Sequence, residues 1–200
     1  AGETPSHIIA PAMHKNRNQV ADLFNAVSKK KLSTEIPELC GFAREHLREK
    51  FLGIDIGITG CNFAIADSGA ITLCTNEGNA RIISALSPTL VTIMGMERIL
   101  PSIEELAVML SLLARSATGQ KITVYNNLST GVRNKNELDG PQEFHLVIVD
   151  NGRSKLLGTK YEKILNCIRC GSCLNACPVY RNIGGHAYGW VYPGPIGAVL

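Results

Sequence analysis

Between residues 55 and 150, short apolar segments with strand character alternate with segments of helical period. The runs LVTIM (90–94) and HLVIV (145–149) are almost continuously apolar, which is typical of strands covered on both faces. A helical apolar pattern at 103–113 follows the capping box Ser102-x-x-Glu105, and Gly119 lies just beyond it. The alternation predicts an α/β fold of three layers, in which helices cover both sides of an open, mostly parallel sheet.

Two further strands, at 62–66 and 70–75, are separated only by the turn signal Asp67-Ser68-Gly69. A connection this short cannot cross over to a parallel strand, so the pair predicts a small antiparallel hairpin. A short strand is also predicted at 122–125, ahead of a polar loop at 131–141.

The preceding residues predict an extended arm over 1–14 and then two helices. The first helix should run from about 15 to 30, and the second should begin after Ser33 or Thr34, which are candidate N-caps. We therefore divide the chain into three parts: an N-terminal arm with helices packed on the core (1–51), an α/β domain (52–160) and a cysteine-rich segment (161–200).

The composition bounds the class of protein. Of the 200 residues, 45% are apolar and 18% charged, which argues against disorder and coiled coil. A net charge of +3 is small for a nucleic-acid-binding protein. No apolar run approaches the roughly 18 residues that span a membrane, and the first residues do not form a signal peptide. We expect a cytoplasmic protein with no transmembrane segment and no nucleic-acid partner.

Seven cysteines fall into two groups. Cys40, Cys61 and Cys74 lie in apolar segments and are expected to be free, mostly buried thiols. The other four form the run Cys167-x2-Cys170-x2-Cys173-x3-Cys177-Pro, the ligand spacing of bacterial two-cluster ferredoxins. A zinc site is the alternative, but such sites usually pair two C-x2-C units across a longer loop. The run predicts a [4Fe–4S] site in a reducing compartment.

In two-cluster ferredoxins the fourth cysteine of such a run ligates the other cluster. No second run follows here, so either Cys177 completes a lone cluster or its partner run lies beyond Leu200. The second interpretation is favoured because the sequence has no initiator Met and stops in mid-pattern, as a fragment would. Cys167, Cys170 and Cys173 should then face a common centre while Cys177 points elsewhere.

Asn76, Glu77, Gly78 and Asn79 lie after a predicted strand and before a predicted helix at 80–86, for which Asn79 is a candidate N-cap. In open α/β sheets, ligands bind at the carboxyl ends of strands, and amides at a helix start hold anions. The loop is therefore either a capped tight turn or a site for an anion such as a carboxylate. Convergence of Asn76, Glu77 and the glycines around 57–60 on one pocket would favour the ligand site.

Long specific segments across the whole chain resemble one family. They include GETPSHIIAPAMHKNR, IGITGCNFAIADSGAI, TNEGNARI, MGMERILPS and LNCIRCGSCLNACPVYRNIGGHAYGWVYPGPIGAVL. They resemble the iron–sulfur subunits of bacterial three-component L-lactate oxidation systems. The resemblance implies a LUD domain, similar in fold to the sugar-phosphate isomerase and CoA-transferase superfamily, followed by a twin ferredoxin-type region. Family members continue past position 200, so we expect two [4Fe–4S] clusters in a full-length chain and an absent or partial cluster here.

The resemblance also implies a function. It indicates an electron-transfer subunit of a complex that oxidises L-lactate to pyruvate, whose partners are the other subunits and an electron acceptor of the respiratory chain. It identifies no catalytic residue on this chain. The alternative is a LUD domain that binds or converts a small anion, with the cluster as an accessory.

Overall fold

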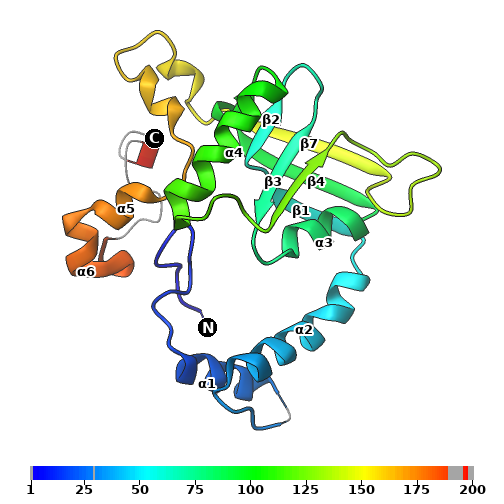
Figure 1. Cartoon of the computed structure of the whole chain (residues 1–200), viewed down its shortest axis with the longest axis vertical. Helices are drawn as coiled ribbons and strands as arrows, with labels where there is room; N and C mark the ends of the chain where they lie inside the picture. Colours follow the sequence, from blue (N-terminus) through cyan, green and yellow to red (C-terminus); the bar gives the residue numbers. More distant parts are fainter. Residues whose placement is uncertain (1, 29, 189–195, 198–200) are drawn as a thin grey trace.

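The computed structural model describes residues 2–28, 30–188 and 196–197 (Figure 1). Within these ranges the strands form two sheets that pack face to face. The parallel sheet has the order β1-β4-β7, formed by Ile56–Gly60, Thr89–Gly95 and Glu143–Val149. The mixed sheet has the order β5-β2-β3-β6, formed by Ile99–Leu100, Phe63–Ile65, Ile71–Thr75 and Tyr125–Ser129.

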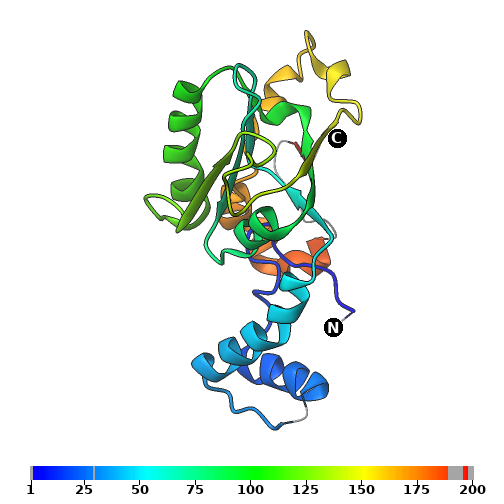
Figure 2. The ribbon, with the colours of Figure 1, turned by 90° about the vertical axis from the view of Figure 1, so that its right-hand side faces the viewer.

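The mixed sheet lies at the centre of the fold. Its inner strands β2 and β3 form the expected antiparallel hairpin, in which Phe63 pairs with Thr72. One face packs on α4 (Ile103–Thr118) through Leu106 and Leu113. The other face meets the parallel sheet through Ala64, Ile71 and Met94. The layers are therefore α4, the mixed sheet and the parallel sheet, with α4 standing to one side of the strands in Figure 2.

This arrangement corrects the expectation that LVTIM and HLVIV are covered on both faces. In β4, Leu90 and Met94 are buried against the mixed sheet, whereas Ile93 on the outer face is 43% exposed. Val147 of β7 is 44% exposed on the same outer face, opposite Ile93. Full burial falls instead on β2 and β3, because the mixed sheet has a layer on each side.

The strand expected at 122–125 was also misplaced. β6 begins at Tyr125 and runs to Ser129, through the polar residues Asn126 and Asn127. Its five residues pair antiparallel with the five of β3, from Thr75 opposite Tyr125 to Ile71 opposite Ser129. Pairing with a buried neighbour therefore outweighs the low strand propensity of asparagine.

Helices α1 (Arg17–Val27) and α2 (Ile36–Leu52) pack on each other and extend away from the sheets in Figure 1, with α2 touching α3 (Asn79–Leu86). The residues that precede α2 and α3 differ from the predicted N-caps. Glu35, rather than Ser33 or Thr34, precedes α2. Gly78, at φ 82°, precedes α3, and Asn79 is the first helical residue. The capping box of Ser102 and Glu105 and the stop at Gly119 are confirmed in α4.

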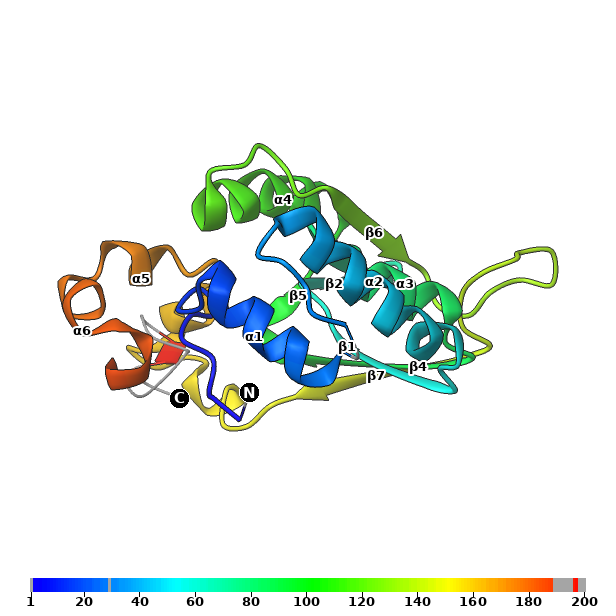
Figure 3. The ribbon, with the colours of Figure 1, turned by 90° about the horizontal axis from the view of Figure 1, so that it is seen from below.

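Beyond β7 the chain forms short helical turns. Single 3₁₀ turns occupy Ser154–Leu156 and Glu162–Asn166, and α5 (Ser172–Ala176) and α6 (Pro178–Tyr188) follow. In the view from below, α5 and α6 stand at one end of the molecule, away from β4 and β7 (Figure 3). Of the predicted segment 161–200, residues 189–195 and 198–200 lie outside the described residues.

Candidate functional site

The cysteine run lies on a loop and a short helix whose backbone bends sharply. Arg169 and Gly171 both have positive φ, at 56° and 76°. Gly171 then precedes α5, which carries Cys173, and Cys177 ends that helix immediately before α6. Because glycine populates this left-handed conformation freely, Gly171 allows the loop to turn back on itself between Cys170 and Cys173.

Three of the four cysteines line one cavity of about 330 Å³: Cys167, Cys170 and Cys173. Cys177 does not line it, and its Sγ instead accepts the backbone N–H of Tyr180 at 3.5 Å. The described residues contain no three His, Cys, Asp or Glu side chains close enough to hold a single metal ion. The three thiols therefore line one cavity without converging on the position of a single ion.

The walls of this cavity suit a thiolate-bound, negatively charged group. Lys163 and Arg169 contribute cationic side chains, and Ile8, Ile164 and Ile168 contribute apolar surface. Burial raises the pKa of Cys173, and the nearby Cys167 and Cys170 raise it further. Thiolates here therefore need a positive partner, and thiolate sulfur is the ligand that iron–sulfur clusters require.

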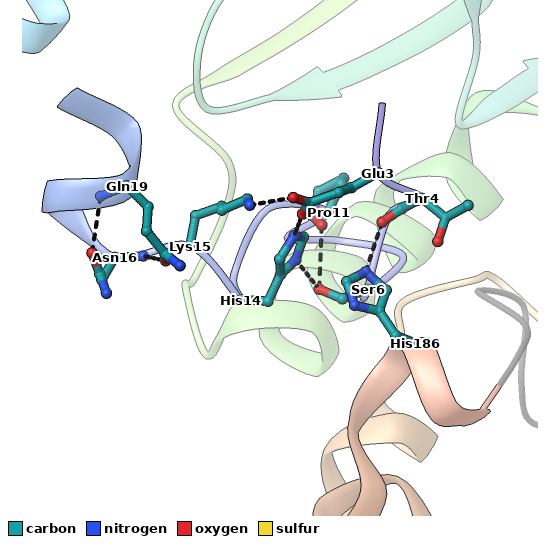
Figure 4. Close-up of polar contacts among 9 residues, drawn as sticks. All are labelled: Glu3, Thr4, Ser6, Pro11, His14, Lys15, Asn16, Gln19 and His186. Carbon is teal, nitrogen blue, oxygen red and sulfur yellow. Dashed lines mark hydrogen bonds and ion pairs between the residues drawn. The ribbon is translucent and has the colours of Figure 1, made fainter. Parts of the chain in front are cut away.

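The N-terminal arm closes over the cysteine segment, although the two are at opposite ends of the chain. Tyr180 donates its hydroxyl hydrogen to the carbonyl of Ser6 at 2.6 Å. His186 Nε2 donates to the carbonyl of Thr4 at 2.8 Å, a contact drawn in Figure 4. A Cβ on Gly185 would lie 1.7 Å from the Ser6 oxygen, so only glycine permits this approach. The arm also places Ile8 in the cysteine cavity.

A polar network holds the arm in shape. His14 lies 2.8 Å from Ser6 Oγ through Nδ1 and 2.9 Å from Glu3 through Nε2, and Lys15 pairs with Glu3 at 2.6 Å (Figure 4). Hydrogen bonds from Lys15 and then His14 lower the pKa of Glu3. Ser6 is only 4% exposed, so this Ser–His–Glu chain orders the arm rather than presenting a nucleophile. Sequence analysis did not predict this network, because residues 3–15 show no periodic pattern.

The predicted ligand loop opens on a second, larger cavity of about 540 Å³. Asn76, Glu77 and Asn79 line it together with Gly60, whereas Gly78 does not and packs on the ring of Tyr125. Asn76 bonds Gln120 and the backbone N–H of Val124, and the Thr75 hydroxyl donates to Glu77 and Asn79. The structure therefore brings the loop together with Gly60 at the end of β1, whereas Gly57 packs against Ser87 and Ile83 outside the cavity.

A cluster of charges separates the two cavities. Glu97, whose side chain is fully buried, pairs with Arg153 at 2.6 Å and with Arg169 at 2.5 Å. Arg98 follows it in a 3₁₀ turn and lines the larger cavity with Arg169. Burial, and then the neighbouring Arg169, lower the pKa of Arg98. Sequence reasoning missed this cluster, because Glu97 and Arg98 looked like ordinary polar residues between two strands.

The three scattered cysteines are free thiols, but they are not uniformly buried. Cys40 is exposed on α2, which contradicts the expectation for that residue, because α2 packs mainly on α1 and α3 and stands away from the sheets. Cys61 and Cys74 are partly buried, and burial raises the pKa of each to about 11.

The fold and the cysteine cavity define an α/β domain joined to an iron–sulfur segment. Residues 3–149 match the LUD domain, and residues 163–198 match a 4Fe-4S dicluster domain. The chain belongs to the LUD domain family, and its cofactor is a 4Fe–4S cluster. The described residues include no helix that is long and apolar enough to cross a membrane.

Two curated relatives of this chain are named for one process. Lactate utilization protein B of Lysinibacillus sphaericus is 59% identical over 99% of this chain and 42% of its own length. The protein of the same name from Bacillus velezensis is 57% identical over the same shares. The chain thus spans less than half the length of these relatives. A crystal structure of a DUF162 family protein from Deinococcus radiodurans is 19% identical and covers 64% of this chain and 83% of that one, with a TM-score of 0.38.

Proposed function

We propose that this chain is part of an electron-transfer iron–sulfur protein in the oxidation of L-lactate to pyruvate. The observation that carries the proposal is the placement of Cys167, Cys170 and Cys173 around one cavity with cationic and apolar walls. The relatives named Lactate utilization protein B supply the process. Oxidation of lactate to pyruvate releases two protons and two electrons, and a carrier must pass the electrons on.

The residues of the cavity have distinct tasks in this proposal. Cys167, Cys170 and Cys173 hold one cluster, and Cys177, whose sulfur lies apart, serves a second. A bound [4Fe–4S] cluster supplies reversible one-electron chemistry. Lys163 and Arg169 offset the negative charge of the thiolates, and Ile8, Ile164 and Ile168 exclude water. The cationic side chains stabilise a reduced, more negative site, whereas the apolar walls disfavour added negative charge, so the two effects together set the reduction potential.

The proposal also includes companion subunits and an electron acceptor. The letter B in the names of the relatives suggests companion subunits, and a respiratory-chain component would accept the electrons. A cytoplasmic location would keep the thiols reduced. The alternative, in which the LUD domain itself binds a small anion, is supported by the convergence of Asn76, Glu77 and Gly60 on one cavity.

Anaerobic reconstitution tests the cluster. The full-length protein that contains this chain should gain iron and sulfide and give an EPR signal on reduction, and Cys170→Ser in that protein should lose most of both. Cys40→Ser, which alters an exposed thiol on α2, is the matched control and should behave as wild type. Equal iron in all three proteins, or none in wild type, would contradict the proposal.

A second measurement tests the electron source. The reconstituted protein is mixed anaerobically with extract of lactate-grown cells, which provides companion subunits. L-lactate should reduce the cluster and produce its EPR signal, whereas D-lactate should not. A cluster that forms but stays oxidised with L-lactate would remove the lactate-dependent role and leave the iron–sulfur assignment intact.

A further inference from the structure

Three guanidinium groups surround one carboxylate at the wall of the 540 Å³ cavity. Glu97 Oε2 accepts a hydrogen bond from Arg153 at 2.6 Å, and Glu97 Oε1 accepts one from Arg169 at 2.5 Å. Arg98 is left at the limit of ion pairing, with its Nε 4.0 Å from Glu97 Oε1. Among the described residues, Glu97 is the only acidic side chain in ion-pair contact with Arg98. The cluster carries an excess of two positive charges.

Arg98 is nevertheless buried. The residue is 7% exposed, and its guanidinium lies 5.9 Å from the centre of the Phe63 ring. A buried cation without a close counter-charge is costly, and desolvation of Arg98 lowers its pKa accordingly. Because arginine stays protonated in proteins, Arg98 needs polar partners, which a bound anion or water in the cavity can supply. The cavity that it lines is the place from which such an anion can approach.

The rest of the cavity suits an organic anion rather than a bare ion. Asn79 and Ala80 line it at the start of α3, where the positive end of the helix dipole favours negative charge, although the Ala80 N–H already donates to Asn79 Oδ1. Leu113, Ala114 and Ala117 of α4 provide an apolar wall. A volume of about 540 Å³ lies within the range of small-molecule sites.

We propose that this cavity binds a small organic carboxylate, whose carboxylate group pairs with Arg98 and whose apolar part faces α4. Three residues, Ile8, Ile168 and Arg169, line both this cavity and the cysteine cavity. The bound acid therefore lies one side-chain layer from the cysteine loop. Arg169 is fixed by Glu97 and forms the shared wall, while Arg98 recognises the ligand.

Calorimetric titration of the iron-free 200-residue chain tests the site with L-lactate, pyruvate and inorganic phosphate as separate probes. At least one of the two carboxylates should bind. Arg98→Gln should weaken that binding by about tenfold or more, the effect of losing a charge-assisted hydrogen bond. Arg133→Gln, in the exposed loop at 131–141, is the matched control and should bind as wild type.

A second variant covers the case in which Arg98→Gln does not fold. Ala117→Phe adds bulk to the α4 wall without removing a charge, and circular dichroism would verify its fold. It should also abolish carboxylate binding. No binding of either carboxylate, binding of phosphate alone, or full binding by Ala117→Phe would each overturn the proposal. Because the titration uses iron-free protein, these outcomes are independent of the cluster measurements.

Discussion

The α/β core and the cysteine segment are stabilised in different ways. In the core, Phe63, Ile65 and Ile71 are each at most 2% exposed and pack between α4 and the parallel sheet. In α5 and α6, by contrast, the buried side chain is that of Leu174. The cysteine loop is held by the packing of Ile168 and Cys170 on the core and by the Arg169–Glu97 ion pair, whereas α6 is held by the arm, through Ser6 and Thr4. Apolar burial thus dominates in the core, whereas the segment depends more on polar contacts to distant parts of the chain and, by our proposal, on iron.

The largest expected effect removes apolar contacts from the core. Ile65→Ala, at a residue 1% exposed, should lower the free energy of unfolding by about 2–5 kcal/mol. Ile56→Ala, at a residue 63% exposed on β1, is the matched control and should cost less than about 1 kcal/mol. Urea denaturation measures both. Equal losses would show that the outer face of the parallel sheet is as well packed as the mixed sheet.

A second change should separate the two regions. Gly185→Ala places a Cβ 1.7 Å from the Ser6 carbonyl oxygen, so α6 and the arm must move apart. Hydrogen exchange should become faster in 167–188 and in 4–14, with little change in β2 and β3. Gly41→Ala, in α2 with open space around it, is the control and should stabilise by up to about 1 kcal/mol. Unchanged exchange in Gly185→Ala would mean that the arm does not hold the segment.

The difference between the core and the cysteine segment also explains which features could be predicted from the sequence. Local signals worked: the capping box of Ser102 and Glu105, the turn at 67–69 and the cysteine spacing each depend on residues a few positions apart. The docking of Thr4 on His186 joins residues 182 positions apart, and nothing local encodes it.

Tertiary context also displaced some local predictions. Asn126 and Asn127 form a strand because β3 pairs with them. Likewise, Arg98 meets Arg169 of the cysteine loop only through the fold. Spacing therefore revealed the cysteine run but not Lys163, Arg169 and Ile8, which complete the walls of the cysteine cavity.

A smaller effect is expected from the helix cap on α4, which belongs to the core. Ser102→Ala removes the side chain that accepts the backbone N–H of Glu104, and should cost about 1 kcal/mol. Ser111→Ala, in the exposed middle of the same helix, should be close to neutral. Thermal unfolding of the two variants measures the difference. A loss no larger than that of Ser111→Ala would show that the capping box does not contribute to core stability.

The smallest expected effect concerns the thiols of the core at alkaline pH. Burial raises the pKa of Cys61 and Cys74 from an ordinary 9.0 to about 11. The folded protein therefore favours the neutral thiols, and this contribution to stability is fully present below about pH 9. It is lost as the pH rises towards about 11, because the unfolded chain releases these protons first.

Urea denaturation at a series of alkaline pH values measures this loss, and comparison between variants removes the contribution of lysines. Cys61→Ala should flatten the decline between about pH 9 and pH 11, because one of the two raised thiols is gone. Cys40→Ala, at an exposed thiol, should leave the slope unchanged. A slope that is the same in all three proteins would show that the buried thiols do not link the core to pH. The pH dependence of unfolding would then not distinguish the cysteines of the core from those of the segment.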